Sequence, residues 1–331
     1  MLPDPQPIRE WRDVDRARFD DEIAPLGEPA VLRGVVADWP AVQAHDIAEY
    51  LGRFDLSAGC DALIAAPGSG GRLFYNDDLT GLNFQTRRPT LATVVERLVR
   101  GREEADSPAI AAQGLAIRDV LPGFAAENRM DLLDEAAAPR MWLGNRVIVA
   151  AHYDMARNIA CVVAGRRRFT LFPPEQVGNL HIGPYEFTPA GAPVSLVDFD
   201  APDLDRFPNF PQAMAAVQSA ELAPGDAIYI PYMWWHHVRS LDAFNLLVNY
   251  WWGEVAQPEH PLDAMLLGLL AIRDLPDDQR RAWRAMFDQF VFRVHGDPMA
   301  HVPTERQGGL GRLDDAAKRG LRQSLAKTLA G

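Results

Sequence analysis

Three residues of the sequence have the types and the spacing of a metal site. His152 and Asp154 lie two positions apart in a segment that we expect to be extended, so their side chains point to the same face. A third ligand comes from far along the chain, where a Pro-Gly-Asp turn at 224–226 leads into an apolar strand and then to His236. Two imidazoles and one carboxylate form the facial triad of non-haem iron sites, which leaves coordination positions open for a cosubstrate and oxygen.

A His-x-Asp tripeptide is weak by itself, because a surface histidine beside a turn aspartate has the same spacing. The neighbouring pattern favours the metal site. Asp154 is followed by a strand, a turn and a second strand, and His236 follows a turn and a strand. The sequence therefore predicts a divalent metal bound by His152, Asp154 and His236.

The segments around these residues have the composition of strands. They are short, rich in β-branched and aromatic residues, and separated by Gly, Pro and Asp turns. We expect strands at 30–36, 62–66, 141–149, 158–164, 167–172, 216–222, 227–230 and 244–252, and helices at 47–54 and 90–101. Proline recurs between Pro173 and Pro211, which predicts a long loop of the kind that is usually functional.

Composition and charge exclude several classes of protein. With 48% hydrophobic and 24% charged residues, the 331-residue chain has the make-up of an ordinary globular protein. Its formal net charge of −12 disfavours nucleic acids and anionic membranes as partners. The apolar run 264–272 is too short to span a bilayer, and no secretory signal is expected. Cys60 and Cys161 form no disulfide framework, which fits the reducing cytoplasm as the location.

The composition changes near residue 260. We expect one domain over 1–260 and a helical region over 261–331, with helices at 261–272, 279–294 and 313–329. Trp283, Met286, Phe287 and Phe290 recur at helical spacing in the second helix. This apolar stripe must be buried, either against the chain's own first domain or against a second copy of the chain.

Three stretches of the chain resemble a known family. They are HYD…N…G…RRFTLFPPEQ from His152, VDFDAPDLDRFPNF from Val197, and PGDAIYIPYMWWHHV…LLVNYWW from Pro224. They resemble the cupin-like branch of the JmjC oxygenases, and within it the asparaginyl hydroxylases. The resemblance implies a mainly β fold, a double-stranded β-helix or jelly roll with flanking N-terminal α/β elements and a C-terminal helical tail. It also implies Fe(II), 2-oxoglutarate as cosubstrate, O2 and a hydroxylated substrate, and pairing of two chains through the C-terminal helices.

The family's functional positions match individual residues of this chain. His152, Asp154 and His236 match the metal ligands, whereas His237 points the other way on a strand. Arg167 stands where the family has a lysine that pairs with the distal carboxylate of 2-oxoglutarate, and an arginine can hold a carboxylate through two hydrogen bonds. Arg166 and Arg168 flank it on the opposite face, where we expect solvent or surface acids.

Three further residues match polar positions of the family's pocket. Asn158 and Asn249 match positions near the iron and the cosubstrate, and Gln113 aligns more loosely with a pocket residue. Each asparagine could instead satisfy local backbone groups. We assign all three to cosubstrate binding.

The chain departs from the family at three places. Val149 replaces a threonine that contacts 2-oxoglutarate, and Ile110 falls near a pocket tyrosine. Pro193 and Val194 replace the Arg-Gln pair that grips the target asparagine in the asparaginyl hydroxylases. We therefore expect a different substrate, which is either a protein side chain or a small molecule.

Three functions remain open from the sequence. The first is an iron- and 2-oxoglutarate-dependent oxygenase, which the triad and Arg167 favour. The second is a non-catalytic metal- or ligand-binding cupin that acts as a regulator or scaffold. The replacement of the cosubstrate-binding threonine by Val149 mildly favours this function. The third is a metal-dependent cupin isomerase or hydrolase that does not use 2-oxoglutarate.

Overall fold

The computed structural model describes residues 2–104, 107–253 and 260–329. The chain divides into two compact units, Met1–Glu254 and Val255–Gly331, which are described separately. The first unit holds all the strands found in the described residues, and the second is helical.

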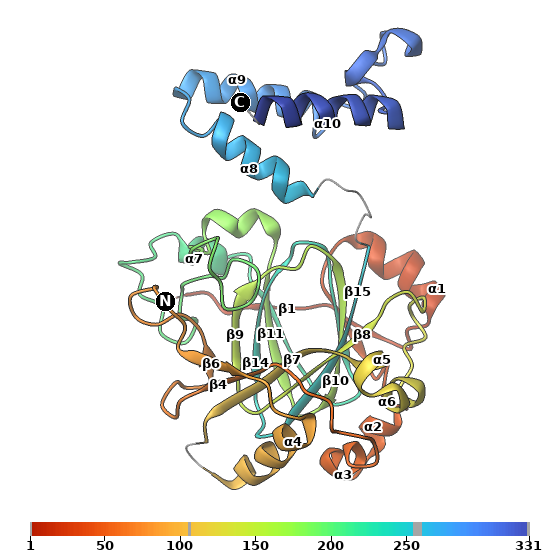
Figure 1. Ribbon diagram of the computed structural model, residues 1–331, viewed down its shortest axis with the longest axis vertical. Coiled ribbons are helices and arrows are strands. Elements are labelled where there is room, and N and C mark those ends of the chain that lie inside the picture. Colours follow the sequence, from red (N-terminus) through yellow and green to blue (C-terminus); the bar gives the residue numbers. More distant parts are fainter. Residues whose placement is uncertain (1, 105–106, 254–259, 330–331) are drawn as a thin grey trace. The chain divides into compact units, whose positions relative to one another are not determined.

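Two large sheets form the first unit (Figure 1). The six-stranded sheet has the order β1 (Gln6–Pro7), β12 (Gln218–Leu222), β11 (Arg167–Phe172), β14 (Trp235–Ser240), β9 (Ile148–His152), β5 (Arg72–Leu73). The nine-stranded sheet has the order β2 (Glu10–Arg12), β3 (Ala30–Arg33), β13 (Ala227–Ile230), β10 (Arg157–Ala164), β15 (Asn245–Trp252), β8 (Pro139–Gly144), β7 (Ala109–Ala116), β4 (Ala62–Ala65), β6 (Phe84–Arg87). This mainly β architecture confirms the predicted jelly-roll fold.

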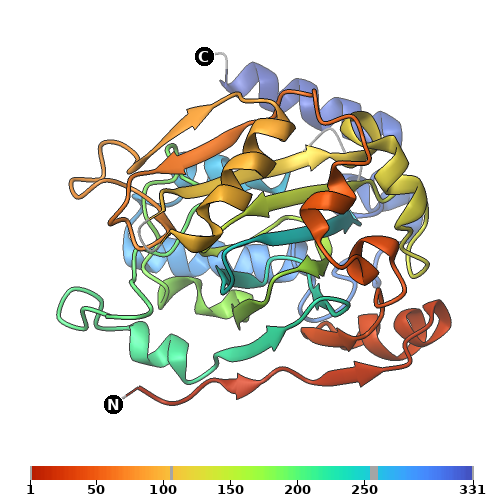
Figure 2. The ribbon, with the colours of Figure 1, turned by 90° about the horizontal axis from the view of Figure 1, so that it is seen from below.

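The central strands of both sheets pair antiparallel, and the N-terminal segment joins the two sheets at one edge (Figure 2). Strand β1 pairs with β12 of the six-stranded sheet, and β2 pairs with β3 of the nine-stranded sheet. Both pairs are parallel. One edge of each sheet, at β12 and at β3, is thereby paired with the chain's own N-terminal segment.

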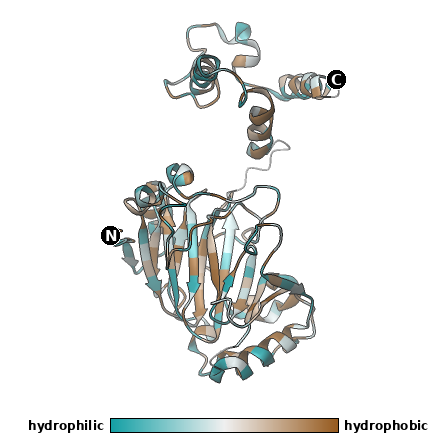
Figure 3. Ribbon diagram, turned by 90° about the vertical axis from the view of Figure 1, so that its left-hand side faces the viewer, coloured by the Kyte–Doolittle hydropathy of each residue, from teal (hydrophilic) through white to brown (hydrophobic). Residues whose placement is uncertain are grey.

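The inner faces of the two sheets share one apolar core. Val162, Ile228 and Leu247 from the nine-stranded sheet pack with Phe169 and Leu171 from the six-stranded sheet. Alternation along the strands directs every second side chain into this core, and the strands in Figure 3 change between apolar and polar along their length. The inner face is therefore apolar except at the positions where polar residues form a site.

Short helices cover the outer face of the nine-stranded sheet. They are α2 (Pro40–Gln43), α3 (Ile47–Leu51), α4 (Leu91–Arg100), α5 (Ile117–Val120) and α6 (Pro122–Glu127), and they contribute to a second, larger core. The predicted helix over 90–101 is confirmed: the Thr90 side chain caps α4, and the apolar stripe from Leu91 to Leu98 is buried. The other α-helices in the described part of this unit are α1 (Arg16–Arg18) and α7 (Phe210–Met214).

The single strand predicted over 141–149 is wrong. The segment forms β8 and β9, which belong to different sheets, and the break lies at 145–147. Gly144 packs so closely on β7 that a Cβ would lie 2.6 Å from the Ile110 carbonyl oxygen. The Asn145 side chain then accepts from the Ile110 amide (2.9 Å) and donates to the Pro108 carbonyl (2.8 Å), which ends the pairing. The chain can therefore cross from the nine-stranded sheet to the six-stranded sheet just ahead of His152.

The second unit contains α8 (Pro261–Ala271), α9 (Asp277–Phe290) and α10 (Asp315–Leu329), close to the predicted helices. Helix α8 is apolar on nearly all sides and is brown along its length in Figure 3. With α9 it lines a groove of about 680 Å³ that contains Trp283 and Phe287. Among the described residues, no helix has the length and apolar content needed to cross a membrane.

Candidate metal centre

The structure brings His152, Asp154 and His236 together. His152 ends β9, His236 lies in β14, and the two residues are direct partners in the antiparallel ladder, with ring centroids 4.2 Å apart. One ligand atom from each of the three residues lies within 4.8 Å of the others. The sequence pattern predicted Asp154 on the same strand as His152. In the structure Asp154 lies instead in the connection from β9 to β10. The strand end lets the carboxylate turn toward His236 instead of continuing along the ladder.

Both histidines are oriented by their own backbone. The Nδ1 atom of His152 lies 2.9 Å from the Ala150 carbonyl oxygen, and Nδ1 of His236 lies 3.0 Å from the Trp234 carbonyl oxygen. Nδ1–H therefore donates in each ring, and Nε2 keeps its lone pair for a metal. Burial, together with the neighbouring His236, lowers the pKa of His152 to about 4, so this imidazole is neutral at pH 7. The donor set of two imidazoles and one carboxylate fits a divalent iron.

A network of side-chain hydrogen bonds holds the Asp154 carboxylate. Its Oδ2 atom accepts from Trp251 Nε1 at 3.0 Å and from Asn158 Nδ2 at 3.3 Å, and it lies 3.6 Å from His236 Nε2. Asn158 Oδ1 accepts in turn from Asn249 Nδ2 at 3.3 Å, and Asn249 Oδ1 accepts from Trp142 Nε1 at 2.7 Å. The donors come from β8, β10 and β15, so the nine-stranded sheet positions a metal ligand that lies in the connection from β9 to β10.

Asn158 and Asn249 belong to this network. Asn158 bonds directly to Asp154, and Asn249 bonds to Asn158. Gln113 lies in β7 near an irregularity in its pairing with β8, and no side-chain hydrogen bond joins it to the network in the described part of the chain. Sequence reasoning missed Trp142 and Trp251. The alternation of β15 offered a signal, because Trp251 is two residues from Asn249 and shares its face.

Arg167 is buried, and its side chain has no ion-pair partner in the described part of the chain. It lies in β11, is 5% exposed, and its Nε atom has no hydrogen-bond partner. Burial lowers the pKa of its guanidinium to about 10. The ladder places Leu171 opposite His236, and alternation puts Arg167, four residues away, on the same inner face. A buried cation without a counter-charge is costly, so the position fits an anionic ligand that enters the core.

The residues expected to point away from the site do so. Arg166 pairs with Asp242 at 3.0 Å, and Arg168 pairs with Glu221. The His237 ring stacks on Phe199 on the outer side of the six-stranded sheet, with centroids 4.7 Å apart. Strand alternation thus directs Arg167 and His236 to the inner face and their neighbours in sequence to the outer face.

The three positions at which the chain departs from the family offer no polar group. Val149 packs against the inner core, Ile110 is buried in the outer core, and Val194 is fully buried beside Phe74 and Tyr75. The residues at these positions are therefore apolar and pack in the cores of the first unit.

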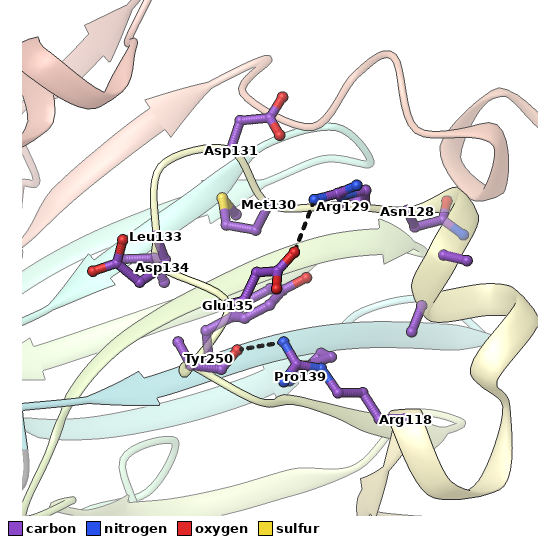
Figure 4. A pocket seen from close by; sticks show the side chains of 13 residues that line it. Arg118, Asn128, Arg129, Met130, Asp131, Leu133, Asp134, Glu135, Pro139 and Tyr250 are labelled. Carbon is purple, nitrogen blue, oxygen red and sulfur yellow. Dashed lines mark hydrogen bonds and ion pairs between the residues drawn. The ribbon is translucent and has the colours of Figure 1, made fainter.

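Other hollows of the first unit carry different chemistry. One hollow of about 550 Å³ lies on the outer side of the nine-stranded sheet, with Tyr250 in its wall and an Arg129–Glu135 ion pair at 3.2 Å (Figure 4). Its charged groups are mixed in sign and exposed. A hollow of about 500 Å³ is lined by Trp251, Trp252 and Arg140, whose guanidinium lies 5.9 Å from the Trp251 ring centroid. That hollow shares Trp251 with the Asp154 network.

Comparison with known proteins agrees with the fold. A family model described as the cupin-like domain matches residues 16–257, well over half of the chain. The chain belongs to the cupin-like family. Relatives include proteins named as JmjC-type lysine-specific demethylases, so the resemblance to the JmjC branch is confirmed.

Three relatives show the range of the family. Lysine-specific demethylase 8 of Danio rerio is 26% identical over 245 residues, covering 71% of this chain and 55% of that protein. HSPB1-associated protein 1 of Homo sapiens is 32% identical over 151 residues, 43% of this chain and 30% of that protein. tRNA wybutosine-synthesizing protein 5 of Mus musculus is 35% identical over 101 residues, 30% of this chain and 29% of that protein. The chain thus spans about half or less of the relatives' length.

Proposed function

We propose that this protein is an Fe(II)- and 2-oxoglutarate-dependent oxygenase that hydroxylates a protein side chain or a small molecule. One observation carries the proposal: a His-Asp-His cluster and an unpartnered, buried arginine share the inner face of one sheet. The cluster is suited to iron, and the arginine is suited to the far carboxylate of a dicarboxylic cosubstrate.

The spacing of these two features suits a short, linear dicarboxylate. Arg167 and the position opposite His236 are four residues apart on β11, which is about 13 Å along a strand. The arginine side chain spans part of that distance, and the cosubstrate would fill the rest. Phe169, Val238 and Leu171 belong to the apolar core on this side of the sheet.

Each group of the chain has a defined task in this function. Bound iron and 2-oxoglutarate supply the activation of O2 and the oxidising power. His152, Asp154 and His236 hold the metal; Trp251 and Asn158 fix the carboxylate of Asp154. Arg167 orients 2-oxoglutarate through its distal carboxylate, at the end of the core away from the cluster.

Arginine in place of the family's lysine matches a bias of the whole chain. The sequence contains only two lysines, Lys318 and Lys327, and no lysine in the first unit. Arginine occupies basic positions throughout that unit. Arginine at 167 therefore does not by itself argue for a different ligand, and its two parallel donors suit a carboxylate.

The relatives bear on the two alternative functions. Two of the three names describe demethylation and wybutosine synthesis, which are enzymatic activities, and the third names only an association. This favours an oxygenase over a non-catalytic cupin. The buried, unpaired Arg167 favours it over an isomerase or hydrolase that has no use for a dicarboxylate. A homodimer through the second unit and a cytoplasmic location remain parts of the proposal that rest on the sequence.

The test measures metal binding and 2-oxoglutarate turnover separately. The wild-type protein with Fe(II) should convert 2-oxoglutarate to succinate. His236→Ala should lose metal in calorimetry, while the control His237→Ala should keep it, because that ring faces the other side of β14.

The cosubstrate role has its own matched pair of variants. Arg167→Leu should retain metal and weaken 2-oxoglutarate binding about 30-fold or more, since breaking a buried ion pair from one side costs about 2–5 kcal/mol. Arg168→Leu, on the outer face, should change neither. Unchanged 2-oxoglutarate affinity in Arg167→Leu, or no succinate from the wild-type protein, contradicts the proposal.

A further inference from the structure

A hollow on the outer face of the six-stranded sheet contains a buried histidine without a partner. The hollow has a volume of about 130 Å³ and is lined by Ile148 and Ala150 of β9 and by His237 of β14. His237 is 9% exposed, and within the described part of the chain its ring nitrogens have no hydrogen bond or ion pair. An imidazole carries at least one N–H in either charge state, so a buried donor remains unused at the wall of this hollow.

Two arginines with few acceptors line the same hollow. They are Arg72 of β5 and Arg239, which shares the outer face of β14 with His237. Arg72 reaches two main-chain carbonyls and the Asp198 carboxylate, all at distances of 3.2 to 3.5 Å, which are longer than an ordinary N–H···O bond. Arg239 has one acceptor among the described residues, the Asp200 carboxylate. Two guanidiniums carry about ten N–H groups, so donors exceed acceptors around the hollow.

The cations of the hollow are more deeply buried than its acids. The side chains of Arg72 and Arg239 are 22% and 26% exposed, whereas those of Asp198 and Asp200 are 46% and 58% exposed. Burial also lowers the pKa of Arg72, which shows that water solvates this guanidinium poorly. Charges interact more strongly where water is excluded, so an anion inside the hollow is attracted by the arginines more than it is repelled by the exposed acids.

The acids and the volume together define the anion. A ligand must replace aspartate carboxylates, which carry a single charge, and must accept from three side chains that approach from two strands. A phosphate group carries a charge of about −1.5 to −2 at pH 7 and has at least three strong acceptor oxygens. A volume of about 130 Å³ equals that of about four water molecules in the liquid, which suits the four oxygens of a phosphate.

We propose that Arg72, Arg239 and His237 bind a phosphate group on the face of β14 opposite the metal centre. The phosphate is either the free ion or the end group of a small monoester. This site is independent of iron and 2-oxoglutarate, so it can be tested without either.

The test is calorimetry on the full chain near neutral pH and at low salt, without added metal or cosubstrate. The wild type should bind inorganic phosphate at one site per chain, and acetate at least about tenfold more weakly because it carries a single charge. Glycerol 3-phosphate distinguishes the two sources of the phosphate group. An affinity equal to or above that of inorganic phosphate supports a monoester, and a lower affinity supports the free ion.

Loss of each donor has an expected size. Arg72→Gln and Arg239→Gln should each weaken phosphate binding about tenfold or more, as expected for lost hydrogen bonds to a charged acceptor. His237→Phe keeps a ring stacked on Phe199 but removes the N–H, and it should weaken binding about three- to tenfold. Arg168→Gln is the matched control, because Arg168 lies on the outer face of the same sheet, pairs with Glu221 and does not line the hollow. It should bind phosphate like the wild type.

Removal of a competing acid should have the opposite effect. Asp200→Asn frees Arg239 from its carboxylate partner and should tighten phosphate binding about two- to fivefold, the range for a partly exposed charge pair. A gain in affinity does not arise from misfolding, so this variant decides the question even if an arginine variant does not fold.

Four results would overturn the proposal. They are no saturable phosphate binding by the wild type, wild-type affinity in both Arg72→Gln and Arg239→Gln, unchanged or weaker binding in Asp200→Asn, and loss of binding in Arg167→Leu, which would place the phosphate on the inner face. None of these results bears on the proposed oxygenase function, which is tested by metal binding and succinate formation.

Discussion

Replacing Trp251 by phenylalanine tests whether the nine-stranded sheet positions the metal ligand. The change removes the Nε1–H that donates to Asp154 Oδ2 at 3.0 Å and keeps an aromatic ring next to Trp142, whose ring centroid lies 6.1 Å away. The remaining donor, Asn158, is more distant at 3.3 Å. Asp154 would then be held by one long hydrogen bond.

The expected magnitude follows from the strength of the lost bond. A hydrogen bond to a charged acceptor contributes about 1.5–3 kcal/mol, and each 1.4 kcal/mol is a factor of ten in affinity. Removal of groups that orient metal ligands generally lowers metal affinity by about 10- to 100-fold. We therefore expect Trp251→Phe to bind Co(II) at least about tenfold more weakly than the wild type.

The assay is Co(II) calorimetry combined with the visible absorption of bound Co(II), which reports the ligand geometry. Trp252→Phe is the matched control, because this neighbouring ring faces the other way and packs near Phe19 and Tyr229 (6.1 and 6.0 Å). It should leave both readings unchanged. Equal Co(II) affinity and spectra in Trp251→Phe and the wild type would refute a positioning role for Trp251.

Two further predictions concern stability and assembly. Asp46 caps α3, accepting from the Ala48 amide at 2.7 Å, and pairs with Arg102 at 2.8 Å; the hydrogen bond from Arg102 is the main reason that its pKa is lowered to about 2. This stabilisation is present above pH 4 and is lost as the pH falls through 2. Asp46→Ala should therefore lower the free energy of unfolding in urea by about 1–2 kcal/mol at pH 7 and by little at pH 2. An equal loss at both pH values would contradict this prediction. Trp283→Glu should convert a homodimer into monomers in light scattering while Ala285→Glu, on the opposite side of α9, should not; a monomeric wild type would disprove the dimer.

Local sequence patterns predicted the elements and the faces well. Turn residues and β-branched runs placed β10, β11 and β13 close to their observed bounds, and alternation along β11 separated Arg167 from its two exposed neighbours. A helical period and a capping threonine identified α4. These features depend on nearest neighbours along the chain, which is the information a single sequence contains.

The failures occurred where tertiary contacts override the local pattern. Residues 141–149 have the composition of one strand, and only the close approach of Gly144 to β7 and the bonds of Asn145 divide it. Asp154 was expected on the strand because the His-x-Asp spacing assumes that the strand continues. The strand ends at His152, and the hydrogen bonds from Trp251 and Asn158 determine the carboxylate's direction instead.

The two tryptophans that sequence reasoning overlooked share one cause. Periodicity along a strand tells which face a side chain occupies, but only the register between strands tells which side chains meet. Trp251 meets Asp154 because β15 lies beside β10, and Trp142 meets Asn249 because β15 also pairs with β8. The ladder between β14 and β9 also contains an irregularity between His236 and Val238. Counting residues from His236 along β14 and from His152 along β9 therefore misplaces Val238 relative to Val149 by one position.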